Sequence, residues 1–198
     1  MLEYENKLQE EGYKLIAGID EAGRGPLAGP VCIAIVIMPL DEDSLIEGVN
    51  DSKKLSEKKR ERLFEEIKQK AIAYHIEFVD EETIDTLNIL NATKLGMMTC
   101  INTIDTKPDV VLIDAVPINS NVKTVSIIKG DSLSYSIACA SILAKVSRDR
   151  LMLELDKKYP EYGFAKHKGY GTKVHIEALK THGKSPCHRD SFIKNFVK

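Results

Sequence analysis

Two adjacent carboxylates, Asp20 and Glu21, stand immediately before a glycine-rich turn that contains one arginine, in the segment IDEAGRGPLAGP at residues 19–30. Carboxylate oxygens are the ligands that hard divalent cations prefer in proteins. Glycine lets a ligand approach the backbone closely, and the planar donors of arginine suit phosphate. The segment therefore predicts a metal-dependent site for a phosphodiester.

Two further carboxylates lie at the ends of predicted elements. Asp114 follows the apolar run at residues 110–113, and Asp131 stands just before a long predicted helix. Hydrolysis of a phosphodiester by two metal ions requires hard oxygen ligands that hold the ions about 4 Å apart. Taken alone, each aspartate could equally be a turn residue or a helix cap. Carboxylates at the ends of neighbouring strands, however, can converge on one site.

Strand geometry limits what the adjacent pair can do. Neighbouring residues of a strand point to opposite faces of the sheet, so Asp20 and Glu21 reach one metal with their side chains only if the strand breaks there. Gly23 makes such a break possible, because glycine accepts a positive φ.

The blocks around these residues resemble ribonuclease HII, the type 2 ribonuclease H family, and they occur in the family's order. They are DEAGRGPLAGP at 20–30, NDSKKL at 50–55, LID at 112–114, KGD at 129–131, SIA at 136–138, AKVSRD at 144–149, HKGYGT at 167–172 and HRDSF at 188–192. The resemblance implies an endoribonuclease that needs two divalent ions, Mn²⁺ or Mg²⁺. It also implies that the catalytic metal ligands are Asp20, Glu21, Asp114 and Asp131.

Substrate recognition is implied by the same resemblance. It assigns contacts with a ribose 2′-hydroxyl, the group that distinguishes RNA from DNA, to Gly23, Arg24, Gly25 and Tyr170. From the residues alone, the turn could be an ordinary hairpin and the tyrosine an exposed loop residue. The implied substrates are the RNA strand of RNA–DNA hybrids and ribonucleotides embedded in duplex DNA. The implied reaction is a nick 5′ of the ribonucleotide by an activated water, leaving 5′-phosphate and 3′-hydroxyl ends.

Phosphate anchoring is assigned more loosely, with Lys53 as the first choice, to Asn50, Lys53, Lys145, Ser147, Arg148 and Thr172. His167 lies between two lysines and is interpreted as part of a solvated basic turn. Two positions depart from the family: Ala115 stands where relatives often have glycine, and Cys139 interrupts a run of small residues. Alanine disfavours a positive φ, so the backbone conformation at Ala115 is in doubt.

Composition limits the class of protein. A chain of 198 residues with 43% hydrophobic and 29% charged residues predicts one ordinary globular domain. Its formal net charge of −2 argues against a protein that coats nucleic acid through overall positive charge. Any binding of nucleic acid must therefore depend on local positive patches. The four cysteines form no Cys-x-x-Cys pair and are expected to be free buried thiols of a cytoplasmic protein. Neither a secretory signal nor a membrane span is expected, and the chain is expected to be a monomer.

The elements that must position these residues follow from hydrophobic periodicity. Apolar or β-branched runs predict strands at 15–19, 31–38, 71–79, 110–113 and 122–128, and amphipathic patterns predict helices from Ser56 and at 91–104, 132–155, 173–181 and 191–197. This order predicts one mixed sheet with helices on its faces. The resemblance implies a ribonuclease H-like α/β fold over residues 1–160 and a small helical C-terminal subdomain over 161–198.

Three alternatives remain at this stage. Ribonuclease HIII has similar carboxylates but a different glycine turn and an added N-terminal domain. A nucleotide-cofactor enzyme would need the Gly-x-Gly-x-x-Gly spacing, which residues 23–29 lack. A non-catalytic nucleic-acid-binding module would have no need of four carboxylates at element ends. The sequence leaves open which metal serves and whether the C-terminal tail recruits a replication partner.

Overall fold

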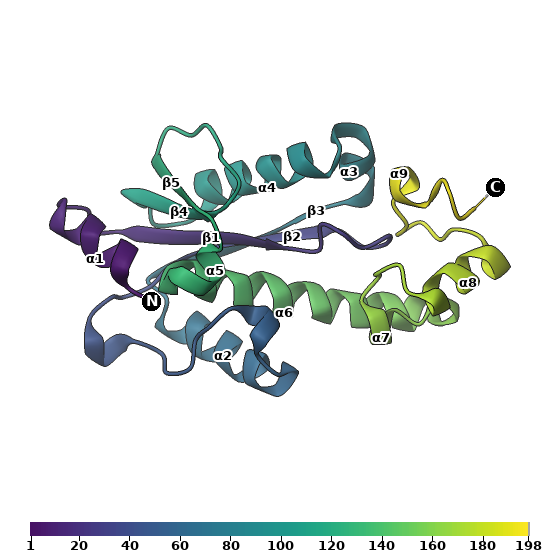
Figure 1. Ribbon diagram of the computed structural model, residues 1–198, viewed down its shortest axis with the longest axis horizontal. Coiled ribbons are helices and arrows are strands. Elements are labelled where there is room, and N and C mark those ends of the chain that lie inside the picture. The colour runs from purple at the N-terminus through teal and green to yellow at the C-terminus, as the bar shows by residue number, and fades with distance from the viewer. Residues whose placement is uncertain (198) are drawn as a thin grey trace.

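A five-stranded mixed sheet forms the centre of the protein, as the computed structural model shows for residues 1–197 (Figure 1). The strands lie in the order β3-β2-β1-β4-β5. Their bounds are Ile16–Ala22 for β1, Val31–Ile37 for β2, Ala73–Val79 for β3, Val110–Asp114 for β4 and Lys123–Ile127 for β5. β2 is antiparallel to both of its neighbours, whereas β1, β4 and β5 are mutually parallel. The predicted mixed sheet is therefore confirmed.

Helices cover both faces of this sheet, because the central strands are apolar on both sides. Helices α2 (Glu57–Lys70) and α6 (Tyr135–Lys158) pack on one face, and α3 (Glu81–Leu87) and α4 (Ile89–Thr103) lie on the other (Figure 1). Every residue of β2 is buried. Its side chains alternate: Ala34 packs with the α2 and α6 layer, and Ile33 with the α4 layer.

One glycine sets the distance between α6 and the sheet. A Cβ built at Gly18 would lie 2.1 Å from the backbone carbon of Ser136. Any larger residue would therefore push the helix away from β1. The contact brings the first turns of α6 directly over the strand that carries Asp20 and Glu21.

The helix predicted at 132–155 is divided in two. A short helix α5 (Gly130–Leu133) precedes α6, and Ser134 between them is extended and caps α6 by accepting a hydrogen bond from the Ile137 N–H at 3.2 Å. Ser56 caps α2 as expected, accepting from the Lys59 N–H at 3.3 Å. The sequence patterns did not predict helices α1 (Glu3–Glu10), α3 and α7 (Phe164–His167).

The elements after Tyr159 gather around the end of α6 that extends past the sheet (Figure 1). They are η3 (Pro160–Tyr162), α7 (Phe164–His167), α8 (Lys173–His182) and α9 (Asp190–Ile193), the last shorter than the helix predicted at 191–197. Their apolar cluster also includes Leu27, Ala28 and Met152 from the earlier part of the chain. The division at residue 160 therefore stays a prediction.

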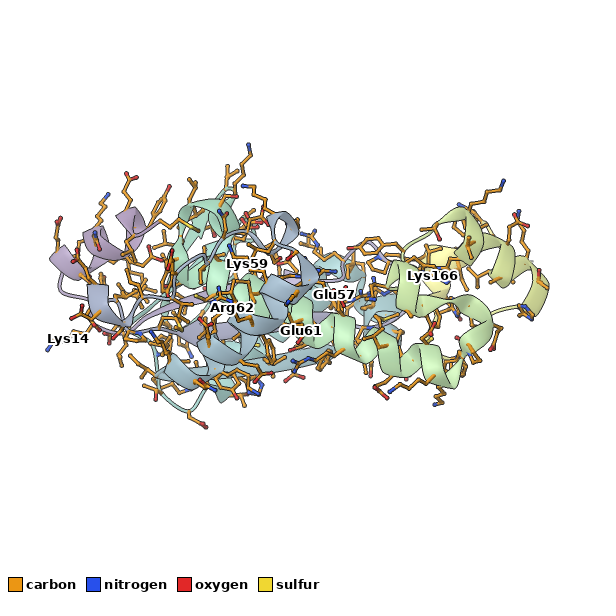
Figure 2. The ribbon with its side chains drawn as sticks, turned by 90° about the horizontal axis from the view of Figure 1, so that it is seen from below. Lys14, Glu57, Lys59, Glu61, Arg62 and Lys166 are labelled. Carbon is orange, nitrogen blue, oxygen red and sulfur yellow. The ribbon has the colours of Figure 1, made fainter. Side chains whose placement is uncertain are left out.

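Three further observations concern the charges on α2, the state of the cysteines and the membrane-crossing potential of the helices. On the outer face of α2, Glu57 and Glu61 stand among Lys59 and Arg62, so this helix offers no uniformly positive face (Figure 2). All four cysteines are buried and free, as expected. Among the described residues 1–197, no helix combines the length and the apolar character that a membrane crossing requires.

Candidate active site

Two of the predicted carboxylates meet through the parallel pairing of β1 with β4. Ile19 pairs with Ile113, so Asp20 and Asp114 occupy the next position on each strand, at the same end of the sheet. Aligned residues on neighbouring strands point to the same face, and the strands lie about 4.8 Å apart. Both carboxylates therefore face the layer of α5 and α6.

Asp20 is almost fully enclosed, with 4% of its surface exposed. Its Oδ1 accepts a hydrogen bond from the Glu21 N–H at 2.8 Å. Burial, together with the negative charges of Glu21 and Asp114, raises the pKa of Asp20 well above its ordinary value. A buried carboxylate in such a field is stabilised by a nearby cation.

Glu21 points to the other face of the sheet, because β1 stays regular through Ala22 and the break comes only at Gly23, with φ of +96°. The expected break between the two carboxylates does not occur. One oxygen of Glu21, Oε1, lies 3.3 Å from Nη1 of Arg24, while Oε2 is buried without a hydrogen-bond partner. Burial raises the pKa of Glu21, and Arg24 partly opposes that shift.

Asp131 reaches the same region from within the short helix α5, whereas it was expected just before the N-terminal end of one long helix. Oδ1 of Asp114 accepts a hydrogen bond from the Gly130 N–H at 2.7 Å, which ties α5 to the end of β4. Asp131 itself is 6% exposed, and its Oδ2 lies 3.1 Å from Nζ of Lys53. Burial, and then the charge of Asp131, raise the pKa of Asp114.

The chemistry of this donor set fits a divalent cation. The four side chains are hard oxygen donors, and the unpartnered Oε2 of Glu21 is a buried lone-pair site that a cation would satisfy. Within residues 1–197, no three His, Cys, Asp or Glu side chains stand close enough together to hold a metal ion. Lys53 and Arg24 instead neutralise two of the carboxylates. Metal binding therefore requires these side chains to turn toward a common centre.

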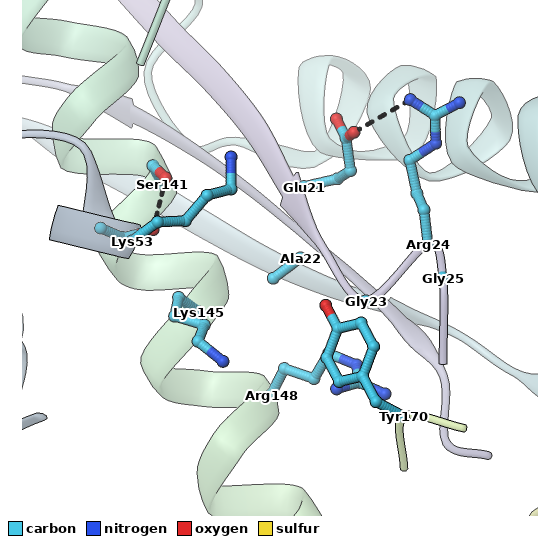
Figure 3. A pocket seen from close by; sticks show the side chains of 11 residues that line it. Glu21, Ala22, Gly23, Arg24, Gly25, Lys53, Ser141, Lys145, Arg148 and Tyr170 are labelled. Carbon is cyan, nitrogen blue, oxygen red and sulfur yellow. Dashed lines mark hydrogen bonds and ion pairs between the residues drawn. The ribbon is translucent and has the colours of Figure 1, made fainter. Parts of the chain in front are cut away.

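A pocket of about 290 Å³ opens beside Glu21 (Figure 3), and Asp20, Asp114 and Asp131 are not part of its wall. Predicted residues form much of its wall, namely Glu21, Gly23, Arg24, Gly25, Lys53, Lys145, Arg148 and Tyr170. The ring of Tyr170 stands opposite the glycine turn: a Cβ built at Gly25 would lie 3.7 Å from Cε1 of the tyrosine. The ring is 45% exposed, so it presents an aromatic face to anything that enters the pocket.

Three predicted phosphate anchors lie outside this wall. Asn50 accepts a hydrogen bond from the Asp51 N–H at 2.8 Å, and Thr172 caps α8 by accepting from the His175 N–H at 3.3 Å. Ser147 is half-buried on α6. The structure thus brings Lys53 and Lys145 to the pocket but not these three residues.

Arg148 lines the pocket, yet three of its five N–H donors already bond to the backbone. It is 1% exposed, and its guanidinium donates at 3.0 Å to each of the carbonyls of Pro30, Lys168 and Ala28. Gly23 adopts its positive φ against this side chain, since a Cβ there would lie 1.9 Å from Nε of Arg148. Arg148 therefore shapes the glycine turn, and its role in phosphate anchoring stays a prediction.

Arg189 also holds the glycine turn, and the sequence analysis did not identify it as a site residue. Fully buried, it donates to the carbonyls of Gly29 at 2.8 Å, Arg24 at 2.9 Å and Gly23 at 2.6 Å. The two arginines hold the whole turn from residue 23 to residue 30. The only signal for this role was the position of Arg189 inside the HRDSF block.

His167 is not the solvated residue that its lysine neighbours suggested. Its ring is stacked on His175, with the ring centroids 4.6 Å apart, and its Nε2 lies 2.9 Å from the Tyr162 carbonyl oxygen. The flanking lysines point elsewhere because the turn itself packs on the C-terminal cluster. The prediction of a solvated basic turn is therefore wrong.

Comparison with known proteins agrees with this architecture. The chain matches the profile of the family described as Ribonuclease HII over residues 17–195. It is 58% identical to the Ribonuclease HII of Ruminiclostridium cellulolyticum over 199 aligned positions, covering 100% of this chain and 77% of the relative. Among solved structures, the ribonuclease HII in the PCNA complex from Archaeoglobus fulgidus superposes with a TM-score of 0.76 at 30% identity, over 89% of this chain and 94% of that one. The ribonuclease H2 of Pyrococcus horikoshii OT3 gives a TM-score of 0.75 at 27% identity, over 90% and 93%.

A mixed sheet flanked by helices, with carboxylates at the ends of β1 and β4 beside an open pocket, defines a metal-dependent nuclease of the ribonuclease H-like fold. This excludes the nucleotide-cofactor and non-catalytic alternatives. The chain belongs to the ribonuclease HII family, and not to the HIII alternative. It is a divalent-metal-dependent endoribonuclease that cleaves the RNA of RNA–DNA hybrids.

Proposed function

We propose that Asp20, Glu21, Asp114 and Asp131 hold two divalent cations, Mn²⁺ or Mg²⁺, and that the nuclease reaction takes place beside them. The observation that carries this proposal is the register of β1 with β4, which sets Asp20 and Asp114 side by side at one end of the sheet, while Glu21, the neighbour of Asp20, lines the pocket. When bound, such ions supply an activated water and neutralise the leaving oxygen. The protein supplies the burial that keeps the carboxylates close and poorly hydrated.

The pocket is proposed to read one ribonucleotide. Backbone groups of the turn at residues 23–25 and the side chain of Tyr170 line the same pocket and lie next to each other. A sugar that enters the pocket would present its 2′-hydroxyl to the backbone, while the ring stacks on the neighbouring sugar or base. This arrangement suits a ribonucleotide embedded in duplex DNA as well as a long hybrid. We expect nicking on its 5′ side, leaving 5′-phosphate and 3′-hydroxyl ends.

Lys53, Lys145 and Arg24 are proposed to bind the phosphates that flank the cleaved bond. All three line the pocket. At present each is paired with a carboxylate: Lys53 with Asp131, Arg24 with Glu21, and Lys145 with Asp149 at 2.8 Å. The bond to Asp131 and the charges of Asp20 and Asp51 raise the pKa of Lys53, although burial alone would lower it. Lys53 therefore stays positively charged beside the site.

Cleavage of a labelled DNA duplex that contains one ribonucleotide tests these assignments. With Mg²⁺ or Mn²⁺ we expect a nick 5′ of the ribonucleotide, and none with a chelator. Asp20→Asn should lower the rate at least about a hundredfold, because it removes a metal ligand but keeps the shape. The matched control is Asp105→Asn, which makes the same change at an exposed aspartate that is distant in sequence from Asp20.

Tyr170→Phe tests the recognition step separately. Losing one hydroxyl should weaken cleavage about tenfold at the single ribonucleotide. If the wild type nicks only long hybrids, the reading of one ribonucleotide by this pocket is wrong. If Asp20→Asn retains full activity, the assignment of the metal ligands is wrong.

The remaining assignments concern the oligomeric state, the cellular location and the partners of the enzyme. We propose a monomer in the cytoplasm, and the four buried free thiols support a reducing compartment. We also propose that the C-terminal tail recruits a replication partner, as the PCNA complex of the Archaeoglobus fulgidus protein suggests by analogy. In this chain Phe196 and Val197 pack partly against the C-terminal cluster, so they would have to leave it to bind a partner.

A further inference from the structure

Three histidines lie together in the C-terminal part of the molecule, outside the set of carboxylates. His175 is 0% and His188 4% exposed, and His167 is stacked on His175. Buried histidines must have their ring nitrogens satisfied. Their hydrogen bonds lead from the chain's C-terminal segment to the backbone of Tyr170.

The hydrogen bonds allow only one arrangement of protons on the ring nitrogens of neutral His175 and His188. The Ser185 backbone N–H donates to Nδ1 of His188 at 3.0 Å, so this nitrogen is an acceptor and the neutral ring carries its proton on Nε2. That Nε2 lies 3.0 Å from Nε2 of His175 and donates to it. His175 must therefore carry its own proton on Nδ1, which donates to the Tyr170 carbonyl oxygen at 2.9 Å.

His167 fits the same scheme. Its Nδ1 accepts from the Gly169 N–H at 3.3 Å, so its proton is on Nε2, the nitrogen next to the Tyr162 carbonyl. The carbonyl of His167 in turn accepts from the Tyr170 N–H at 2.9 Å. Histidines thus bind both backbone groups of Tyr170, one through its side chain and the other through its main chain.

We propose that His175 and His188 are positioning residues for substrate recognition: as a chain of two neutral imidazoles, they fix the backbone of Tyr170 so that its ring stays opposite Gly25. This inference rests on the proposed role of Tyr170 in reading the ribonucleotide. It adds that the two histidines influence recognition without contacting the substrate, because neither of them lines the substrate pocket.

Burial alone does not fix the side chain of Tyr170. The residue is 45% exposed, and glycines stand on both sides of it. Gly169 has a positive φ of +84° and packs tightly, since a Cβ there would lie 2.4 Å from the Ala28 carbonyl oxygen. Two donors meet the Tyr170 carbonyl, the Thr172 N–H at 2.8 Å and Nδ1 of His175. Of these, only His175 connects the loop to a buried framework.

Two amide substitutions separate the ends of the His175 ring. In His175→Asn the side-chain amide lies near the position of Nδ1 and can still donate to Tyr170. In His175→Gln it lies near the position of Nε2 and keeps only the contact with His188. We expect His175→Gln to lower kcat/KM on the duplex with one ribonucleotide about tenfold, mainly through KM, and His175→Asn to restore most of it. His182→Gln, an exposed residue of the same helix, is the control.

A double-mutant cycle decides whether His175 acts through Tyr170. Once Tyr170→Ala has removed the ring, His175→Gln should cause no further loss of kcat/KM. An equal tenfold loss in that background would overturn the proposal while leaving the role of Tyr170 intact. If Tyr170→Ala alone leaves cleavage unchanged, the recognition role of Tyr170 is refuted, and this inference falls with it.

The protonation pattern can be tested in the wild-type protein without any activity assay. Nitrogen NMR of the histidine side chains should show the proton on Nδ1 of His175 and on Nε2 of His188 near neutral pH. The reverse pattern on either ring, or a doubly protonated ring, would contradict the hydrogen-bond chain.

Discussion

The buried His188 makes the stability of this protein depend on pH with a definite sign. Burial, and then the neighbouring His175, lower the pKa of His188 from 6.5 to about 4 in the folded state. Between these values the unfolded chain binds a proton that the folded protein does not. Stability therefore falls as the pH falls. The contribution is fully present above pH 6.5 and is lost as the pH approaches 4.

The size of the effect follows from the two pKa values. With 6.5 in the unfolded chain and about 4 in the folded protein, the free energy of unfolding decreases by about 2 kcal/mol between about pH 7 and about pH 4.5. Charged groups near the ring are included in that value, with Asp190 raising the pKa of His188 and Lys184 lowering it. Further acidic side chains line the same cavity, namely Glu81, Glu82 and Asp85.

The carboxylates of the site work in the opposite direction. Their raised pKa values mean that the folded state binds protons first, so Asp20, Glu21 and Asp114 add stability as the pH falls. A comparison with a variant removes this contribution, because the carboxylates are the same in both proteins.

The perturbation is His188→Asn, measured by urea unfolding with a chelator present at the two pH values. Asparagine can accept the Ser185 hydrogen bond but has no group that titrates. We expect the variant to be less stable at about pH 7, and the difference from the wild type to shrink by about 2 kcal/mol at about pH 4.5. A difference that stays constant over this range would refute the reasoning.

Further expectations concern the backbone of the site. Ala115 has a positive φ of +54°, so Ala115→Gly should stabilise the protein by about 0.5–1 kcal/mol in urea unfolding, and a loss would contradict the strain. Gly18→Ala should lower the free energy of unfolding by at least about 2 kcal/mol, because its Cβ would meet the α6 backbone at 2.1 Å; an unchanged midpoint would refute that contact. Arg189→Met leaves buried carbonyls of the glycine turn unpaired and should cost about 3–5 kcal/mol. It should also speed limited proteolysis at residues 23–29, and an equal cleavage rate would argue against the holding role.

The sheet and the positions of the carboxylates were predictable because they depend on local patterns. Continuous β-branched runs predict buried strands, and a carboxylate directly after such a run lies at an element end. Asp114 fits this logic, since it is the last residue of β4. The parallel register that aligns it with Asp20 is a long-range property, and it followed only from the resemblance to a family.

Short helices were missed. Helix α1 has only two apolar residues among its eight, Tyr4 and Leu8, and α3 has only seven residues, so neither gives a pattern long enough to be recognised in the sequence. The division between α5 and α6 depends on a single extended residue, Ser134, which a periodic pattern cannot show. Asp131 therefore lies inside α5 and not just before one long helix, where it was expected.

The contacts of the arginine and histidine side chains were the least predictable from the sequence. Arg148 and Arg189 look like surface residues in the sequence, yet most of their partners are carbonyls that lie more than a hundred positions earlier in the chain. His167 was misjudged for the same reason, because its stacking partner belongs to another helix. The function of such a side chain is set by residues distant in sequence, which no local pattern reveals.

The bonds from Arg189 to the turn at residues 23–29 bear on how the protein is made. The turn is synthesised well before the arginine that holds it, because Arg189 follows Gly29 by 160 positions. Residues 27–29 also exchange backbone hydrogen bonds with residues 187–189. A nascent chain that has not reached residue 189 therefore lacks the groups that hold this turn, and the wall of the substrate pocket is completed late in synthesis.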